Sequence, residues 1–168
     1  MKKTERNMFF ALIILIMYSG FISAQIDIGI EEKEAAVPVS VKISGLDKPI
    51  TIGKTVKAGI TFEVEEGYKI NLVPLFSVEA QPAETDLKIS TDVLYDKDKL
   101  AEAKRKLAKG ESVYLDHNKT HHFSVTITGK PGADSISVNW KVTLFYCSTD
   151  DGLCFKETLR KESILKIR

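Results

Sequence analysis

The chain has 168 residues, of which 43% are hydrophobic and 28% are charged, and its 24 basic residues nearly balance its 23 acidic residues. This length corresponds to about one ordinary globular domain. The balanced charge lacks the basic excess of nucleic-acid-binding domains, so no nucleic-acid partner is expected.

The first segment is typical of a secretory signal peptide. Basic residues at its start precede an apolar run over residues 8–17, and Ile22-Ser-Ala24 provides a small-residue cleavage site. We predict that residues 1–24 are a signal peptide, that the mature chain begins at Gln25, and that the protein is periplasmic or secreted. No stretch of the mature chain is apolar for long enough to span a membrane, so no span is expected after cleavage. The alternative is an uncleaved membrane anchor.

Alternation of apolar and polar residues predicts strands with one buried face over most of the remaining chain. The predicted strands are Val39–Ile43, Val56–Val64, Tyr68–Leu72, Leu87–Val93, Ser112–Leu115, Phe123–Ile127, Ile136–Tyr146 and a final strand within Thr158–Ile167. Many short strands separated by turns favour an antiparallel sandwich over an α/β fold. We therefore predict an all-β antiparallel β-sandwich that forms a single domain over residues 25–168.

One segment, residues 96–110, departs from the strand pattern. It contains strong helix formers, with Leu100, Ala103 and Leu107 at helical spacing and Gly110 where a C-terminal cap belongs. Its six basic residues outnumber its three acidic residues. We predict a short inserted helix, which either packs its leucines on the sandwich or forms a lid or docking element beside the cysteines.

The chain has only two cysteines, Cys147 and Cys154, and they flank a polar loop of turn-forming residues. This pattern indicates a hairpin tip. Cysteines that face each other across a hairpin have Cα atoms about 4.5 to 5.5 Å apart, which a disulfide can bridge. In the same register Tyr146 faces Phe155, an aromatic pair that helps to fix the alignment.

Such a disulfide closes a short loop, so it adds roughly 2.5 kcal/mol to stability. Immunoglobulin-type disulfides instead join two sheets beside a buried tryptophan, whereas both cysteines here follow Trp140 in one hairpin. A disulfide at an exposed tip is accessible to an attacking thiolate. The pattern favours thiol–disulfide exchange, and the alternative is a redox-inert binding or structural β-sandwich whose disulfide staples a loop.

The segments around the cysteines follow a recognisable order. Gly67-Tyr-Lys-Ile-Asn71 and Ser112-Val-Tyr-Leu115 precede a strand over residues 138–146, which ends in Tyr-Cys and is followed by Gly-Leu-Cys-Phe155. This order resembles the N-terminal periplasmic domain of the DsbD thiol:disulfide interchange family. The resemblance extends roughly from Thr55 to the C-terminus, and its most specific part is the cysteine hairpin.

The resemblance implies an immunoglobulin-like β-sandwich in which Cys147 and Cys154 are the redox pair. The full prediction is therefore an all-β, immunoglobulin-like antiparallel β-sandwich with one short inserted helix. It also implies a component of a protein-disulfide reductase or interchange system. The pair would take electrons from a thioredoxin-like protein or a membrane electron conduit and pass them to oxidised periplasmic proteins. By its position in the hairpin, Cys154 is expected to attack the partner disulfide. Exchange of this kind needs no bound cofactor, and none is expected.

The chain departs from this family in three respects. Six residues separate the cysteines, about one more than in the best-known members. The basic helix occupies the position of the family's capping loop, which leaves Tyr95 and Leu107 as candidate caps. The membrane conduit and thioredoxin-like domain of DsbD have no counterpart in this sequence, so the electron donor is expected on another polypeptide.

The three histidines, His117, His121 and His122, are candidate metal ligands or candidate partners of a nucleophilic cysteine. Strand alternation points His121 and His122 to opposite faces, so the two cannot readily bind one ion. No signature of a cysteine hydrolase is present. A metal protein or a hydrolase is therefore the least favoured class, and no metal site is predicted.

Overall fold

The structure, a computed structural model, describes residues 37–168. The predicted signal peptide, its cleavage site after Ala24 and the start of the mature chain at Gln25 lie outside the described residues. Within the described part, no helix is long and apolar enough to cross a membrane.

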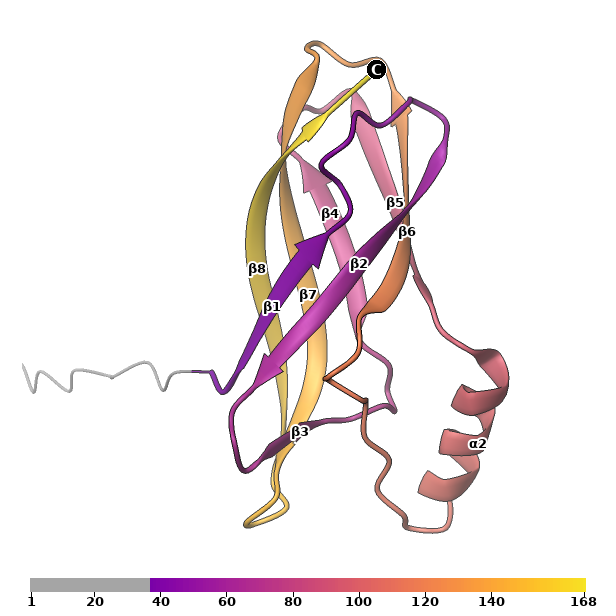
Figure 1. Cartoon of the computed structure of the whole chain (residues 1–168), viewed down its shortest axis with the longest axis vertical. Helices are drawn as coiled ribbons and strands as arrows, with labels where there is room; N and C mark the ends of the chain where they lie inside the picture. Colours follow the sequence, from indigo (N-terminus) through magenta and orange to yellow (C-terminus); the bar gives the residue numbers. More distant parts are fainter. Residues whose placement is uncertain (1–36) are drawn as a thin grey trace, which may run out of the picture. The chain divides into compact units, whose positions relative to one another are not determined.

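Two antiparallel sheets pack face to face (Figure 1). The first has the order β1 (Val39–Ser44), β2 (Thr55–Val64), β6 (His121–Gly129), β5 (Leu87–Leu94). The second is centred on β7 (Ser135–Ser148), with β8 (Cys154–Lys166) along one edge and β3 (Tyr68–Ile70) and β4 (Ser77–Pro82) along the other. The predicted fold class, an all-β antiparallel sandwich with one short inserted helix, is confirmed.

The core lies between the two sheets and is formed by alternate residues of their strands. On β7 the buried side chains are Ile136, Val138, Trp140, Val142 and Leu144, and on β6 they are Phe123, Val125 and Ile127. The Trp140 ring packs edge-on against Phe123, with centroids 5.9 Å apart, and its indole N–H donates to Ser163 Oγ at 2.7 Å. Each sheet therefore contributes one apolar face, as the alternation in the sequence predicts.

Three details of the strand prediction differ from the structure. Residues 112–115 do not form a strand, because only Tyr114 makes an isolated bridge, to Asn71. β4 was missed, because only Val78 of that strand is fully buried and the strand ends in Pro82. β8 begins at Cys154, earlier than predicted, because its first half has exposed charged residues that mask the alternation.

The predicted helix is present as α2 (Lys97–Leu107). Asp96 caps its N-terminus, since its carboxylate accepts the amides of Asp98 and Lys99 at 2.9 and 3.2 Å. The chain leaves the helix through Gly110, whose φ of 82° requires a glycine. Only Ala103 of the helix is fully buried, and Leu107 remains 47% exposed. The helix is thus held to the sandwich mainly by a small residue, while Leu107 is left at the surface.

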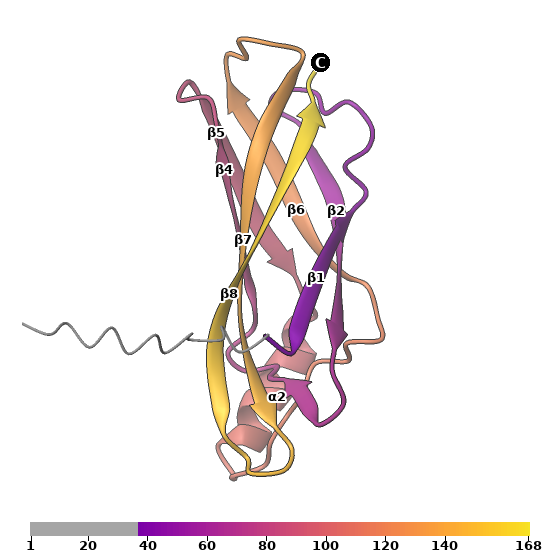
Figure 2. The ribbon, with the colours of Figure 1, turned by 90° about the vertical axis from the view of Figure 1, so that its left-hand side faces the viewer.

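The helix and the tip of the β7–β8 hairpin lie at the same end of the sandwich (Figures 1 and 2). The C-terminus lies at the opposite end. This arrangement gathers the cysteines, the end of β3 and the segment that follows α2 in one region.

Candidate functional site

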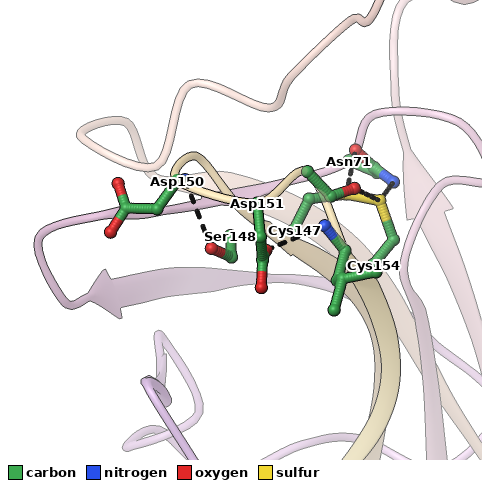
Figure 3. Close-up of a disulfide and its surroundings, with 8 residues drawn as sticks. Asn71, Cys147, Ser148, Asp150, Asp151 and Cys154 are labelled. Atoms are coloured by element: carbon green, nitrogen blue, oxygen red, sulfur yellow. Dashed lines mark hydrogen bonds between the residues drawn. A yellow bond between two sulfur atoms is a disulfide. The ribbon is translucent and has the colours of Figure 1, made fainter.

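Cys147 and Cys154 form a disulfide across the β7–β8 hairpin, with an S–S distance of 2.07 Å (Figure 3). Their Cα atoms lie 4.0 Å apart, which is closer than the sequence-based expectation. The amide of Ser148 donates to the carbonyl of Leu153 at 2.9 Å. Ser148 and Leu153 therefore form a hydrogen-bonded pair of the ladder. The next pair, Cys147 and Cys154, is a non-hydrogen-bonded pair, in which the two Cα atoms lie closer together.

The predicted aromatic pair next to the disulfide is confirmed. Tyr146 stands opposite Phe155 in the register, and their rings stack with centroids 5.5 Å apart at an interplanar angle of 30°. Burial raises the pKa of the Tyr146 phenol, and the nearby Glu157 carboxylate adds to this. Tyr146 is thus a neutral, largely apolar support beneath the hairpin tip.

The tip itself is a turn fixed by side-chain and backbone hydrogen bonds. The carboxylate of Asp151 accepts the amide of Leu153 at 3.0 Å, and this bond, followed by one with Ser148, lowers the pKa of Asp151. The amide and hydroxyl of Thr149 both donate to the carbonyl of Gly67, at 2.7 and 3.0 Å. The aspartate has the predicted turn-forming role, and the tip is also anchored to the turn that precedes β3.

The two cysteines differ sharply in exposure. Cys147 is only 4% exposed and lies between two strands, since it pairs with Lys69 of β3 on one side and with Cys154 of β8 on the other. Cys154 lies on the outer strand and is exposed. A thiolate or a disulfide of a partner protein therefore has access to Cys154 and little access to Cys147.

Asn71 directly follows β3 and places its amide against both sulfurs (Figure 3). Its Oδ1 lies 3.2 Å from Cys147 Sγ, and its Nδ2 lies 3.9 Å from Cys154 Sγ. Asn71 is not among the site residues predicted from the sequence. In the sequence it is only a polar residue at the end of a predicted strand. Its place beside the cysteines follows from the pairing of β3 with β7.

A pocket of about 200 Å³ opens beside the disulfide. Its lining comes from three parts of the chain, namely the end of β3, the end and following segment of α2, and the cysteine hairpin: Asn71, Val73, Leu107, Ser112, Val113, Tyr114, Cys147, Gly152 and Cys154. The side chains of Leu107 and Tyr114 are 47% and 38% exposed, and those of Leu153 and Phe155 on the hairpin are 57% and 45% exposed. The disulfide thus lies within a partly apolar surface.

Of the two candidate caps, the structure brings only Leu107 to the disulfide. Tyr95 instead stacks on His121, with centroids 6.3 Å apart. Tyr114, which sequence reasoning did not select, lines the pocket and has the ammonium of Lys69 5.1 Å from its ring centroid. The aromatic group nearest the disulfide pocket therefore comes from the loop after the helix.

The histidines do not contribute to this pocket. His121 shares the core-facing side of β6 with Phe123, and its Nε2 lies 2.9 Å from the carbonyl oxygen of Asp116. His122 points to the other face, as alternation predicts. Among residues 37–168, no three His, Cys, Asp or Glu side chains gather as a group that could hold a metal ion.

No protein-family model matches the chain, and no curated protein matches it. Among solved structures, the chain is similar to a family 123 glycoside hydrolase from Clostridium perfringens, whose structural analysis concerned glycolipid glycan hydrolysis. The match covers 79% of this chain and 28% of that one, at 12% sequence identity and a TM-score of 0.34. A likeness this weak supports no inference about fold or function.

Proposed function

We propose that the protein is an extracytoplasmic thiol–disulfide exchange module. Cys147 and Cys154 would pass electrons between a thioredoxin-like or membrane donor and oxidised protein partners. The observation that carries the proposal is the unequal exposure of the pair, with Cys154 exposed beside a surface pocket and Cys147 only 4% exposed behind it. Exchange needs one sulfur that partners can reach and a second that is close but protected.

The chemistry proceeds in two balanced steps. In the reduced protein, the Cys154 thiolate attacks one sulfur of a partner disulfide, and the other partner sulfur leaves as a thiolate. Cys147 then gives up its proton and attacks Cys154 Sγ, which re-forms the domain disulfide and releases the second partner sulfur. The partner gains two electrons, the proton given up by Cys147 and one proton from the solvent, which received it when Cys154 ionised. A dithiol donor restores the reduced domain by the reverse steps.

Two further observations support a protein as the partner. The apolar side chains of Leu107 and Tyr114, which line the pocket and are 47% and 38% exposed, suit contact with another protein surface. The hairpin tip also stands at the end of the sandwich, where a partner can approach it. The resemblance to the DsbD family and the expected signal peptide favour the periplasm as the compartment.

The second candidate function is that of a redox-inert binding or structural sandwich. It is favoured by the backbone bonds around the tip, since Thr149 already ties the hairpin to Gly67 and a disulfide there further rigidifies a short loop. The two functions differ in how easily thiols reduce the bond.

The reduction potential of the Cys147/Cys154 couple tests the proposal. The mature protein is equilibrated in glutathione or dithiothreitol buffers, and its thiols are trapped and counted. We expect a value well above about −300 mV, the range of labile, exchanging disulfides. A much lower value, together with no exchange with thioredoxin-like proteins, would leave the stapled sandwich as the function.

A pair of matched variants tests the roles of the two cysteines. Cys147→Ser retains the exposed sulfur without its resolving partner, so it should accumulate a mixed disulfide with an oxidised thioredoxin-like protein. Cys154→Ser retains only the buried sulfur and should accumulate little. Equal trapping by both variants would contradict the assigned roles.

A further inference from the structure

Asn71 presents the two polar atoms of one amide to the two sulfurs of the same disulfide. The oxygen is the atom near the buried Cys147, at 3.2 Å, and the nitrogen is the atom near the exposed Cys154, at 3.9 Å. The exchange steps described above make no use of this residue. Its contacts nevertheless distinguish one sulfur from the other.

The backbone around Asn71 is fixed on both sides. The backbone N–H of Asn71 donates to the carbonyl of Phe145 on β7 at 2.8 Å. The flanking residues are bonded to the segment that follows the helix, since Ile70 accepts the amide of Leu115 at 2.8 Å and Leu72 donates to Val113 at 2.9 Å. The side chain therefore projects from a segment held between β7 and the 112–115 segment, which keeps its amide against the cysteines.

The amide acts differently in the two redox states. A disulfide sulfur carries no hydrogen, so the oxygen of Asn71 and Cys147 Sγ make only a van der Waals contact in the oxidised protein. After reduction, a Cys147 thiol can donate its hydrogen to this oxygen, which favours the protonated form. The N–H of Asn71 can donate to a Cys154 thiolate, which favours the charged form.

We propose that Asn71 is a positioning residue that holds reduced Cys147 as a thiol and Cys154 as a thiolate. This inference rests on the proposed exchange function and assigns the order of attack within it. Cys154 attacks the partner first, and the hydrogen that Asn71 retains on Cys147 leaves with the reduced partner when Cys147 resolves the mixed disulfide. In this proposal a single neutral amide makes one cysteine the nucleophile and the other the resolving thiol.

Charged and titratable groups near the cysteines are competing causes. Lys69 of β3 stands opposite Cys147, and its ammonium lies over the ring of Tyr114, which lines the pocket. Asp150 and Asp151 lie in the turn between the cysteines. The helix contributes the apolar Leu107 to the pocket. An ammonium at this pocket favours the thiolate form of the cysteine that it approaches, so Lys69 is a competing cause that has to be tested separately.

The test measures alkylation of the reduced full-length mature chain by iodoacetamide across pH, with the modified cysteine identified by peptide mass mapping. In the wild-type protein Cys154 should be alkylated first, with a pKa below the value of about 8.5 for a free thiol. Asn71→Ala should raise the pKa of Cys154 and slow its alkylation at neutral pH about tenfold, since one pKa unit corresponds to a tenfold change in thiolate fraction. Asn71→Asp preserves the shape but replaces the donor with a negative charge, so it should raise this pKa further.

Two control variants separate the alternatives. Asn139→Asp changes an exposed asparagine of β7 far along the strand from the cysteines and should leave both thiol pKa values unchanged. Lys69→Gln should leave the preference for Cys154 in place. Near-ultraviolet circular dichroism of each oxidised variant verifies that it is folded, and Asn71→Ser replaces Asn71→Ala if the latter is not.

The outcomes are distinguishable from those of the exchange function itself. If folded Asn71 variants retain the wild-type pKa of Cys154, or if Lys69→Gln abolishes the preference, the role of Asn71 is overturned while exchange stands. If the wild-type protein exchanges with no thioredoxin-like partner, the exchange function is overturned first. A raised pKa with lost preference for Cys154 only in the Asn71 variants supports the inference.

Discussion

Gly129, at the end of β6, is a residue whose identity is fixed by backbone geometry. Its φ is +108°, and a Cβ at this position would overlap the carbonyl oxygen of Asp86 on the neighbouring chain segment. Gly129→Ala should therefore cost at least about 3 kcal/mol, because a strained backbone and a steric clash add together. The free energy of unfolding in urea measures this effect.

Gly67 provides the matched control. It also has a positive φ, +86°, but a Cβ there would meet nothing within 4 Å. Gly67→Ala should lose only about 1 to 2 kcal/mol, the cost of the left-handed conformation alone. An equal loss of unfolding free energy in the two variants would show that the backbone near Asp86 moves aside without cost.

At the same scale, the sequence predicts the cysteine pair but not its neighbour. The facing of Cys147 and Cys154 and the stacking of Tyr146 on Phe155 follow from one local hairpin, whose register is set by a short turn. Asn71 lies 76 residues before Cys147 and reaches it only because β3 pairs with β7. Contacts of that range depend on the assembled sheet, which local patterns do not specify.

Among the elements, α2 depends on its N-terminal cap, since only Ala103 of the helix is fully buried. Asp96→Ala removes the acceptor of two helix amides and should cost about 1 kcal/mol of helix stability. Hydrogen exchange of the helix amides should become faster, while that of the sheet amides remains unchanged. Asp98→Ala removes a carboxylate from the same first turn without removing the cap, so it should have a smaller effect. Equal effects of the two variants would point to charge alone.

Elements with strong alternation were predicted and elements with weak alternation were not. β6 and β7 carry long runs of buried alternate residues, and their prediction is confirmed. β4 buries only Val78 completely, so its pattern is too weak to recognise. The segment 112–115 alternates because Val113 and Leu115 pack inward, yet it makes only one bridge. Alternation therefore reports which side chains are buried, and it does not report whether the backbone pairs over enough residues to form a strand.

At the scale of the whole fold, the core lies between the sheets, whereas the disulfide lies at one end of β7. The large side chains that are fully buried, such as Trp140, Phe123 and Ile60, come from β7, β6 and β2. Cys147 and Cys154 pair at the end of β7, and only six residues separate them. A protein that exchanges disulfides also has to remain folded in both redox states, so a core independent of the cysteines is a condition for the proposed function.

Reduction of the protein tests this independence. Because the disulfide closes a short loop, its loss should lower the free energy of unfolding by about 2.5 kcal/mol and leave the fold intact. Urea unfolding with and without dithiothreitol measures the loss, and near-ultraviolet circular dichroism of the buried Trp140 reports whether the core persists. The Cys147→Ser/Cys154→Ser double variant, which has no thiol to reoxidise, should match the reduced protein. If the reduced protein unfolds without denaturant, the disulfide is a structural staple, because a domain that collapses on each reduction cannot return electrons to a partner.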